Sequence, residues 1–487
     1  MYFIIADDLT GATDTGIQFQ KRGIATTVLV EPPKEALPCP GERTALSVNA
    51  SSRELCPQEA RDRTQEVMQR VVLRDQDTLF KKVDSLMRGN PVEELEAALE
   101  AAGRRIALAA PSFPRMGRTV DGGVLRLPDG SAKDLLALFR ERAHMAVCHI
   151  PLARLRAEGA GLAADLVRRE APLLCLIDAV TEEDLSLAAG IGQALDTPPV
   201  YCGSAALAEA LPVRGEQPDV PCRPAARRVL VVTGSQKKET AAQVRRLEAV
   251  CGLHKVLLDS ARLLHEPAPE EISRAAQRLT ELLRQEDGAI LAFDSLFCSQ
   301  TGFADDDVAA RKVGKSLAAK LGEVLGRIDH TLYDGLILVG GDTAVAVCRS
   351  LQTTQLLLLE EVLSGTPAGL LADGPLRGIP VVTKSGAFGD EDTLLHAWKY
   401  MSAFEKLCNE YRENKRLIEE LEAMNDSIKA DILAIMGDRE TVTEGASKAT
   451  YKAVTSSRFD SSGFRKVYPD LFTEYSTPTT YRRFTVQ

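Results

Sequence analysis

The regular alternation of short apolar segments with longer helix-like segments is the feature that most constrains the fold of this chain. Eight apolar segments have the length of strands, and they are Phe3–Ala6, Thr26–Val30, Arg105–Ala109, Leu173–Ile177, Val229–Val232, Ala289–Phe293, Leu336–Val339 and Val381–Thr383. Stretches with apolar residues at helical spacing lie between them, such as Val92–Ala102, Ala241–Val250, Glu270–Arg284 and Val308–Gly326. Strands that alternate with helices form mainly parallel sheets covered by helices. The alternation therefore predicts an α/β protein.

Length and composition exclude several classes of protein. The chain has 487 residues, of which 45% are hydrophobic and 26% charged, so we expect a globular protein with about two or three domains. No apolar run approaches the roughly 18 residues of a membrane span, and Met1 leads directly into a strand without the basic segment of a secretory signal. The ten cysteines are scattered, which favours reduced thiols in the cytoplasm over disulfides or structural zinc. The net charge of −10 argues against nucleic-acid binding over the whole chain.

A proline-rich segment marks a domain boundary near the middle of the chain. Four prolines lie within residues 212–228, a density that opposes both helix and central strand. We expect a first domain at residues 1–211, a linker at 212–228, a second domain at 229–402 and an appended tail at 403–487. The predicted architecture is two α/β domains with mainly parallel sheets that flank a cleft, followed by a long helix and a small β-rich segment.

The first predicted strand runs directly into a group of carboxylates. Asp7 and Asp8 follow it, and Gly11 and Asp14 lie in the helix that is predicted next. In parallel α/β sheets, ligands bind outside the carboxyl ends of strands, so these aspartates can contact a substrate hydroxyl, hold a metal or take a proton. The alternative is that one aspartate caps the helix while the others are exposed. Taken alone, the Asp-Asp pair favours neither interpretation.

Three further segments place polar and cationic groups after apolar runs. The segment KKVDSLMRGN contains two lysines, an aspartate, a serine and an arginine within ten residues. NASSR places Arg53 behind another apolar run, and APSFPRMGRTVDGG brings two arginines after the strand Arg105–Ala109. Cations beside a carboxylate and a hydroxyl suit an anionic ligand with several hydroxyl groups, because arginine binds a carboxylate through two parallel hydrogen bonds. Each segment alone is compatible with a solvated loop, but together they predict a crevice.

Glycines separate a strand from a helix at three points in the second predicted domain. They are Gly234 in VVTGSQKKET, Gly340-Gly341 in ILVGGDTAVAV and Gly386 in VVTKSGAFGD. Glycine lets backbone N–H groups approach a phosphate closely, and the following helix N-terminus offers partial positive charge. Neither the Walker A pattern nor G-x-G-x-x-G is present. The three junctions together indicate an unconventional nucleotide site.

A crevice of cations and carboxylates in one domain and phosphate loops in the other favour phosphoryl transfer across a cleft, with Mg²⁺ bridging the phosphates.

Residues 1–402 resemble the four-carbon acid sugar kinases in seven ordered motifs, namely IADDLTGATD, NASSR, KKVDSLMRGN, APSFPRMGRT, VTGS, GGDTA and TKSGAFGDED. The resemblance implies that ATP phosphorylates the terminal hydroxyl of threonate, erythronate or 3-oxo-tetronate. It also implies that the first domain binds the acid and the second the nucleotide.

The resemblance assigns site residues in both domains. It implies an acid site made of Asp8, Arg53, Lys82, Val83, Asp84 and Ser85. We add Arg88 to this site because it is a nearby cation. It implies an ATP site made of Ser235, Gly340, Gly341, Asp342, Thr343 and Gly386. We add Lys384 to this site because its compact charge can reach the phosphates. Asp8 is the first candidate for the catalytic base by position, with Asp84 and Asp342 as rivals. Asp342 could instead serve Mg²⁺ or position a phosphate, and the metal ligands stay unassigned.

The second acid-site motif departs from the usual family sequence K-T-D-S-T-L-R-G-N. Here Val83 replaces a threonine, and Leu86-Met87 replace Thr-Leu. Fewer hydroxyl groups are therefore available in this loop. The departure makes the preferred acid and its stereoisomer harder to predict than the chemistry.

The tail combines a predicted long helix with an aromatic segment. Ser402–Ile435 carries apolar residues at nearly heptad spacing, namely Phe404, Leu407, Tyr411, Ile418, Leu421, Ile428 and Ile435. Such a seam needs a partner surface, so we expect an interaction or homo-oligomerisation element. Residues 403–487 also resemble the C-terminal segment of YqaJ-type phage recombination exonucleases, but the nuclease core is missing and no nuclease activity is implied. The tail's aromatics are interpreted as the core of a small module, in preference to a surface for single-stranded nucleic acid.

Other interpretations are weaker. His144, Cys148 and His149 are close in sequence, but no fourth zinc ligand accompanies them and the segment resembles a strand. Lys237-Lys238 is interpreted as an exposed helix start rather than a phosphate contact. The alternative functions are a nucleic-acid-associated protein that acts through the tail, and a sugar-acid-binding protein without catalysis. The intact glycine loops argue against the second alternative.

Overall fold

The chain forms two compact units in a computed structural model. The structure describes residues 1–37, 41, 43–169, 172–213, 225–265, 269–297, 308–402 and 404–476. The first unit is Met1–Ser402 and the second is Ala403–Gln487. Most of the predicted linker, residues 214–224, lies outside the described residues. Below, the N-terminal half and the C-terminal half are the parts of the first unit before and after this segment.

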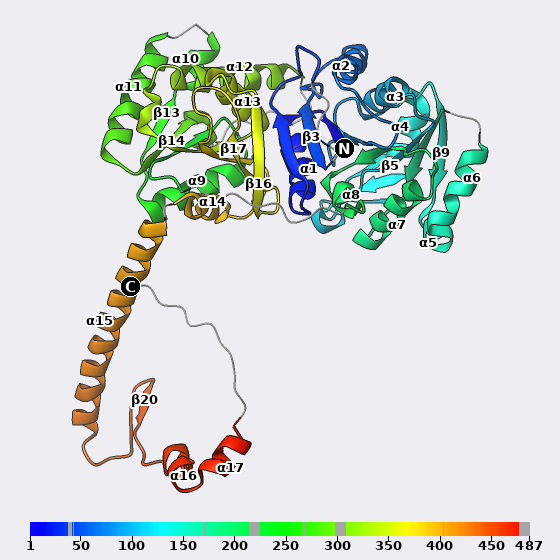
Figure 1. The fold of residues 1–487 in the computed structure, drawn as a ribbon. Helices are drawn as coiled ribbons and strands as arrows, with labels where there is room; N and C mark the ends of the chain where they lie inside the picture. The colour runs from blue at the N-terminus through cyan, green and yellow to red at the C-terminus, as the bar shows by residue number, and fades with distance from the viewer. Residues whose placement is uncertain are drawn as a thin grey trace. The chain divides into compact units, whose positions relative to one another are not determined.

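One sheet of fifteen strands extends through the first unit (Figure 1). In sheet order, the N-terminal half contributes eight parallel strands, namely β2 (Ala25–Leu29), β3 (Thr44–Asn49), β1 (Tyr2–Ala6), β4 (Thr78–Lys82), β11 (Val200–Gly203), β5 (Ile106–Ala110), β10 (Leu173–Ile177) and β9 (Ala146–Ile150). The C-terminal half contributes the order β13 (Lys255–Leu258), β14 (Gly288–Phe293), β12 (Val229–Thr233), β15 (Gly335–Val339), β18 (Pro380–Lys384), β17 (Thr366–Leu371) and β16 (Gln355–Leu363). The eight predicted strands are confirmed, with shifts of one residue at some ends.

Helices accompany the strands in both halves. The N-terminal half contains α1 (Leu9–Gln20), α2 (Pro57–Gln69), α3 (Pro91–Ala101), α4 (Leu135–Arg142), α5 (Leu152–Glu158), α6 (Leu162–Arg168), α7 (Glu182–Gln193) and α8 (Ala205–Ala210). The C-terminal half contains α9 (Lys238–Cys251), α10 (Ser260–His265), α11 (Pro269–Gln285), α12 (Val308–Leu325), α13 (Gly341–Ser350) and α14 (Thr393–Met401). A small separate sheet is formed by β6 (Thr119–Asp121), β7 (Val124–Arg126) and β8 (Ala132–Asp134).

Strand β1 shows how the core specifies a central parallel strand. Phe3 and Ile5 belong to one buried cluster, while Ile4 between them belongs to another. Side chains alternate between the two faces of a strand, so apolar residues at every position require helices on both faces. This arrangement confirms the predicted α/β class with a mainly parallel sheet.

The continuity of the sheet differs from the expectation of two separate sheets. Strand β16 pairs antiparallel with β2 of the N-terminal half and with β17, and β17 pairs antiparallel with β18. Strand direction is therefore reversed between the two parallel sets. Strand β15 is the sixth strand from β1 in the sheet, and the two strands run in opposite directions. A twist of about 20–25° between neighbouring strands rotates β15 relative to β1, so that the carboxyl ends of both strands face the same side of the molecule.

The second unit begins with the predicted long helix. Helix α15 (Phe404–Met436) confirms that prediction, with its first residue two positions later. A hairpin of β19 (Thr441–Glu444) and β20 (Ser447–Thr450) follows, and then the short helices α16 (Ser461–Val467) and α17 (Pro469–Glu474). Among the described residues, every helix of the chain is too short or too polar to span a lipid bilayer.

The tail's aromatic residues do not form the core that we expected. Tyr451, Phe459, Tyr468 and Tyr475 are exposed, because the one short hairpin in the described part of the tail offers no second layer to cover them. Tyr481 and Phe484 lie outside the described residues. The other two described aromatics, Phe464 and Phe472, are only partly buried, so interpreting the tail's described aromatics as a buried core is wrong.

A fully buried ion pair connects strand β4 to helix α3. Lys81 Nζ lies 2.6 Å from Glu94 Oε2, and neither side chain reaches solvent. Lys81 also donates to the Lys82 carbonyl at 3.0 Å. Burial raises the pKa of the Glu94 carboxyl, and the charge of Lys81 opposes this rise. The pair lies where β4 ends, directly before the polar loop that the sequence singled out.

We expect Lys81→Met to lower the free energy of unfolding by about 3–5 kcal/mol, because it leaves the Glu94 carboxyl buried without its partner. Denaturant unfolding followed by circular dichroism measures the change. The double variant Lys81→Met/Glu94→Leu removes both polar groups, and we expect it to be more stable than Lys81→Met alone. Equal stability of the single variant and the unchanged protein would contradict a structural role for the pair.

Candidate functional site

The site lies where the order of strands in each half changes direction. In the N-terminal half, β2 and β3 follow β1 in the chain and lie on one side of it in the sheet, and the next strand, β4, lies on its other side. In the C-terminal half the chain leaves β12 toward β13 and β14 and returns to β15 on the opposite side. Loops after such strands diverge and leave a crevice at their carboxyl ends. The loops after β1, β4, β12 and β15 all line the cavities described below.

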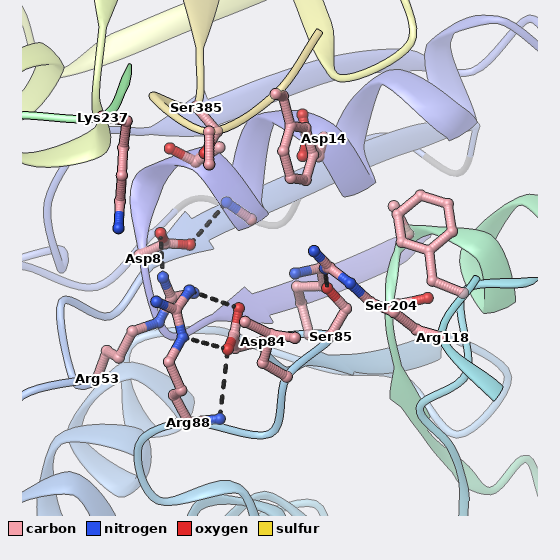
Figure 2. Close-up of a pocket in the computed structure, with 18 residues that line it drawn as sticks. Asp8, Asp14, Arg53, Asp84, Ser85, Arg88, Arg118, Ser204, Lys237 and Ser385 are labelled. Atoms are coloured by element: carbon pink, nitrogen blue, oxygen red, sulfur yellow. Dashed lines mark hydrogen bonds and ion pairs between the residues drawn. The ribbon is translucent and has the colours of Figure 1, made fainter. Parts of the chain in front are cut away.

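Arg53 holds the two adjacent carboxylates at the end of β1. Its Nε and Nη2 donate to both oxygens of Asp7 at 2.7 and 2.9 Å. Its Nη1 donates to Asp8 Oδ2 at 2.6 Å, and Figure 2 shows Arg53 beside Asp8. Burial would raise the pKa of the Asp7 carboxyl, but the Arg53 guanidinium outweighs burial and holds that pKa below its usual range. The pKa of Arg53 is raised in return by the same carboxylates. Asp7 and Arg53 are therefore charged.

Asp8 performs a second task as the N-cap of helix α1. Its Oδ1 accepts a hydrogen bond from the Gly11 N–H at 2.7 Å. An acidic N-cap satisfies one of the free N–H groups and interacts favourably with the helix dipole. The capping alternative from the sequence is thus correct for Asp8, and it fixes the carboxylate between Arg53 and the start of α1.

The loop after β4 presents alternate side chains to the site. Lys82 and Asp84 line a cavity, whereas Lys81 joins its buried pair and Val83 lies in the hydrophobic core beside Met87. The period of two in extended backbone explains this separation. Val83 is therefore placed away from the cavity.

Two arginines organise the remaining polar groups of this loop. Arg88 donates from Nε and Nη2 to the two oxygens of Asp84 at 2.6 and 3.0 Å. Burial acts to raise the pKa of the Asp84 carboxyl, but Arg88 and Arg53 together hold it far below its usual range. Arg118, from the loop after β5, donates to the Ser85 hydroxyl. Figure 2 shows these groups around the same small space.

The first cavity is small and mixed in character. Its volume is about 130 Å³. Its lining combines charged, hydroxyl and apolar side chains, and the main members are Asp8, Thr10, Asp14, Arg53, Lys82, Asp84, Ser85, Arg88, Phe113, Arg118, Ser204, Lys237, Ser385 and Phe388. Pockets for drug-sized ligands are several times larger, about 300–1,000 Å³. The first cavity therefore suits a small polar ligand.

The second cavity is larger and is lined by the glycine loops. Its volume is about 460 Å³, and its lining includes Gly234, Ser235, Gly340, Gly341, Asp342, Thr343 and Gly386. Gly340 has a φ of 103°, a conformation that side chains disfavour. A methyl group on Gly341 would lie 3.0 Å from the Thr10 hydroxyl oxygen and 3.7 Å from Asp8 Oδ2. Glycine at this position therefore lets the start of α13 approach the end of β1.

Threonine hydroxyls tie the glycine loops to one another. The Gly234 N–H donates to Thr343 Oγ1 at 3.0 Å, and Thr240 Oγ1 donates to the Gly386 carbonyl at 2.7 Å. Asp342 lies in the first turn of α13, where partial desolvation by the surrounding loops and the charge of Glu54 raise its pKa to about 6. The three loops thus form one structure with a helix N-terminus open toward the cavity.

The two cavities adjoin. They share seven lining residues, namely Asp8, Thr10, Arg53, Arg88, Lys237, Ser385 and Ala387. Asp8 is the carboxylate among them, and it lies close to the first turn of α13. A ligand in the small cavity and a ligand in the large cavity would therefore meet beside Asp8.

Lys384 is placed differently from the other residues of the predicted nucleotide site. It is buried at the end of β18, and its Nζ donates to the Ser385 carbonyl at 2.6 Å. Burial lowers its pKa to about 8. Lys384 supports the loop that lines the second cavity from behind.

Several lining residues were not assigned from the sequence. Asp14 follows Asp8 by six positions, and its place in the same motif was the only available signal. Arg118 lies in a loop that the sequence analysis quoted without selecting a residue. Lys237 was interpreted as an exposed helix start, yet it lines both cavities. Ser204 and Phe388 carry no sequence pattern of their own.

The two histidines considered for zinc contact carboxylates, and Cys148 between them is a buried free thiol. His149 Nε2 lies 2.9 Å from Asp178 Oδ1, and His144 Nδ1 lies 3.1 Å from Glu96 Oε2. Within the described ranges, no group of three or more histidines, cysteines, aspartates and glutamates is arranged to hold a metal ion.

Two family models match the first unit. The model of a sugar-binding N-terminal domain matches residues 2–211, and that of a nucleotide-binding C-terminal domain matches residues 230–394. The D-threonate kinase of Salmonella typhimurium is 30% identical over 428 residues, which are 82% of this chain and 97% of the relative. The D-threonate kinase of Bordetella bronchiseptica is 34% identical over 411 residues, which are 81% of this chain and 96% of the relative.

A solved structure shows the same fold. A Salmonella typhimurium LT2 protein, described as a candidate tRNA synthase, superposes with a TM-score of 0.65 at 22% identity, covering 82% of this chain and 99% of its own. The resemblance of the tail to phage recombination exonucleases receives no support from these comparisons. With both family models matched and kinases at 30% identity or more aligned over nearly their whole length, the chain belongs to the four-carbon acid sugar kinase family.

Proposed function

We propose that this protein transfers the γ-phosphoryl group of ATP to the terminal hydroxyl of a four-carbon sugar acid. The observation that carries the proposal is the pair of adjoining cavities, one small and cationic and one large and lined by glycine, that meet at Asp8. Both relatives named above are D-threonate kinases, so D-threonate is the first acid to test. In this proposal residues 1–211 bind the acid, residues 229–402 bind the nucleotide and 212–228 link them.

The small cavity supplies the groups that an acid with several hydroxyls requires. Arg53 and Arg88 are already paired with aspartates. Lys82 is buried against the cavity, and the structure gives its ammonium no hydrogen bond or ion pair with any described residue. A ligand carboxylate beside Lys82 would supply the missing counter-charge. Ser85 and Ser204 add hydroxyl groups for the rest of the ligand.

The large cavity supplies the groups that a triphosphate requires. The loops at Gly234, Gly340–Gly341 and Gly386 allow close approach of phosphate oxygens, and the N-terminus of α13 attracts their charge. Asp342 suits Mg²⁺, because this ion in nucleotide sites takes one or two carboxylates together with phosphate oxygens and water. When bound there, Mg²⁺ would neutralise charge on the phosphates. Lys237 lines both cavities and lies along the path of the transferred group.

Asp8 is the best placed of the three candidate bases. Asp84 is bound by Arg88 through both oxygens and holds its proton too weakly to act as a base near neutral pH. Asp342 faces the phosphate side. We propose that Asp8 orients the terminal hydroxyl of the acid and accepts its proton. As that O–H bond breaks, the oxygen bonds to the γ-phosphorus and the bond from phosphorus to ADP breaks.

The direct test is ADP release with a panel of acids. We expect turnover with one or more of D- and L-threonate, D- and L-erythronate and their 3-oxo forms, and D-threonate is the first choice. Release of ADP without an acid measures the background ATPase. A folded protein that binds ATP and turns over none of these acids would refute the proposed activity.

We expect Asp8→Asn to lower kcat by at least about 100-fold with intact folding, since general-base catalysis contributes roughly 10²–10⁴-fold. Asparagine still caps α1, whereas Asp8→Ala also loses the cap, which costs about 1 kcal/mol of stability. Initial rates and thermal unfolding of both variants separate the two effects. Unchanged kcat in Asp8→Asn would exclude Asp8 as the base.

We also propose a cytoplasmic location and self-association through α15. The cysteines that the structure describes are free thiols, which suits a reducing compartment. The heptad seam of α15 is exposed, with Leu421 59% and Ile428 54% accessible. Asn414 and Asn425 occupy two seam positions. If two copies of α15 pair in parallel, each asparagine faces the same asparagine of the second copy. If they pair antiparallel, Asn414 faces Asn425 of the partner subunit. In both cases polar seam residues face polar ones, so a second copy of the chain fits the seam.

We expect the full chain to be at least a dimer, and Leu421→Glu/Ile428→Glu to dissociate this contact because buried glutamates would face each other. Light scattering coupled to size exclusion measures the molar mass. The matched control is Ala423→Glu/Ala430→Glu, which adds the same charges on the opposite face of α15. A wild-type mass of one chain, or an unchanged mass in the seam variant, would contradict the contact.

A further inference from the structure

Helix α1 carries a second carboxylate into the acid cavity. Asp14 lies in α1, is 8% exposed and lines the first cavity. Its Oδ1 is buried and has no hydrogen-bond partner among the described residues. A buried carboxylate oxygen without a donor is costly, and native proteins rarely retain one without a ligand or a water to satisfy it. Figure 2 shows Asp14 on α1 beyond Asp8, at the edge of the same space.

Charged groups from three elements surround Asp14. Lys82 comes from β4, Asp8 from the start of α1 and Glu361 from β16. Burial raises the pKa of Asp14 to about 7, the two carboxylates act in the same direction, and Lys82 opposes them. Asp14 therefore changes its charge near neutral pH, whereas Asp84 in the same cavity stays ionised.

The position of Asp14 separates it from the phosphoryl-transfer step. Asp8 lines both cavities, whereas Asp14 lines the small cavity and not the large one. A group that contacts Asp14 thus belongs to the ligand of the small cavity. A ligand carboxylate is a poor partner for Asp14 because like charges repel, and Lys82 is available for it. What remains is a hydroxyl group along the carbon chain.

We propose that Asp14 accepts a hydrogen bond from a secondary hydroxyl of the bound sugar acid and thereby selects acids with a hydroxyl at that carbon over acids with a carbonyl there. The proposal rests on the proposed function and names a specificity residue within the same site. A carbonyl oxygen offers no proton, so it would face the Asp14 carboxylate with two acceptors and no donor. Sites built to pair a substrate hydroxyl discriminate strongly against analogues that cannot donate.

The substitution Asp14→Asn tests the proposal, because asparagine keeps the size of the side chain and replaces an acceptor oxygen with a donor. Binding of D-threonate and of its 3-oxo form to the full-length protein is measured by titration calorimetry without ATP. We expect the affinity for D-threonate to fall about 10- to 100-fold, as for loss of a hydrogen bond to a charged group. We expect the affinity for the 3-oxo acid to stay the same or rise.

The matched control is Thr15→Val, a near-isosteric change at a buried neighbour on α1 that lies outside both cavities. It should leave the ratio of the two affinities unchanged. A ratio that is the same in Asp14→Asn as in the wild type, or no binding of D-threonate to the wild type, would overturn the proposal. If wild-type protein binds the acid but does not phosphorylate it, the proposed kinase activity fails while the assignment of Asp14 is still measured.

The pH dependence supplies a readout that a purely structural role would not move. The ionised carboxylate accepts the hydrogen bond of the hydroxyl more strongly than the protonated form does, so affinity for D-threonate should fall as pH decreases through about 7. This inflection should disappear in Asp14→Asn. Asp342, whose pKa is about 6, belongs to the other cavity and remains in the variant, so it cannot account for the loss. Persistence of the inflection near pH 7 in Asp14→Asn would overturn the proposal.

Discussion

The hydrogen bonds from Arg53 to Asp7 and Asp8 fix the geometry on which the rest of the site depends. Without a cation, the buried carboxylate of Asp7 and the partly buried carboxylate of Asp8 would repel each other at the end of β1, which would favour protonation of one of them. Arg53 binds both, so Asp7 stays charged and Asp8 is held against the start of α1. The cation that the sequence suggested for a ligand carboxylate is thus used by the protein itself. Lys82 and Arg118 line the small cavity without a carboxylate partner among the described residues.

The continuous sheet explains how two sets of loops reach one place. In a flat sheet, the antiparallel pairings of β16 and β17 would put the carboxyl ends of the two parallel sets on opposite edges. Twist accumulated over the intervening strands turns these edges together. Contact between Gly341 and Thr10 is the local result. The antiparallel pairings of β16 and β17 therefore help to bring the two sets of loops together.

The strands and most of the polar lining could be predicted from the sequence, because both follow local rules. Apolar runs that end in Asp8, Lys82, Gly234 or Gly340 locate the carboxyl ends of strands, and parallel topology brings those ends together. Strand alternation could also have separated Lys82 from Val83. The continuity of the sheet depends on pairing between distant edges, which periodicity does not encode. Asp14 could not be assigned because its importance comes from burial, and burial appears only when α1 packs against the sheet.

The carboxyl groups near the cavities differ in acidity, and the differences follow from their neighbours. Asp84 has a bidentate arginine and remains ionised under all ordinary conditions. Asp14 is buried without such a partner, Asp342 lines the second cavity without one, and their pKa values rise to about 7 and about 6. Separate environments allow chemically identical groups to take separate roles within one site. An always-ionised group can hold cationic side chains in place, and a group with raised pKa is available to a metal ion or a ligand proton. The arginines of the N-terminal half therefore determine which carboxylates are structural and which can respond to a ligand.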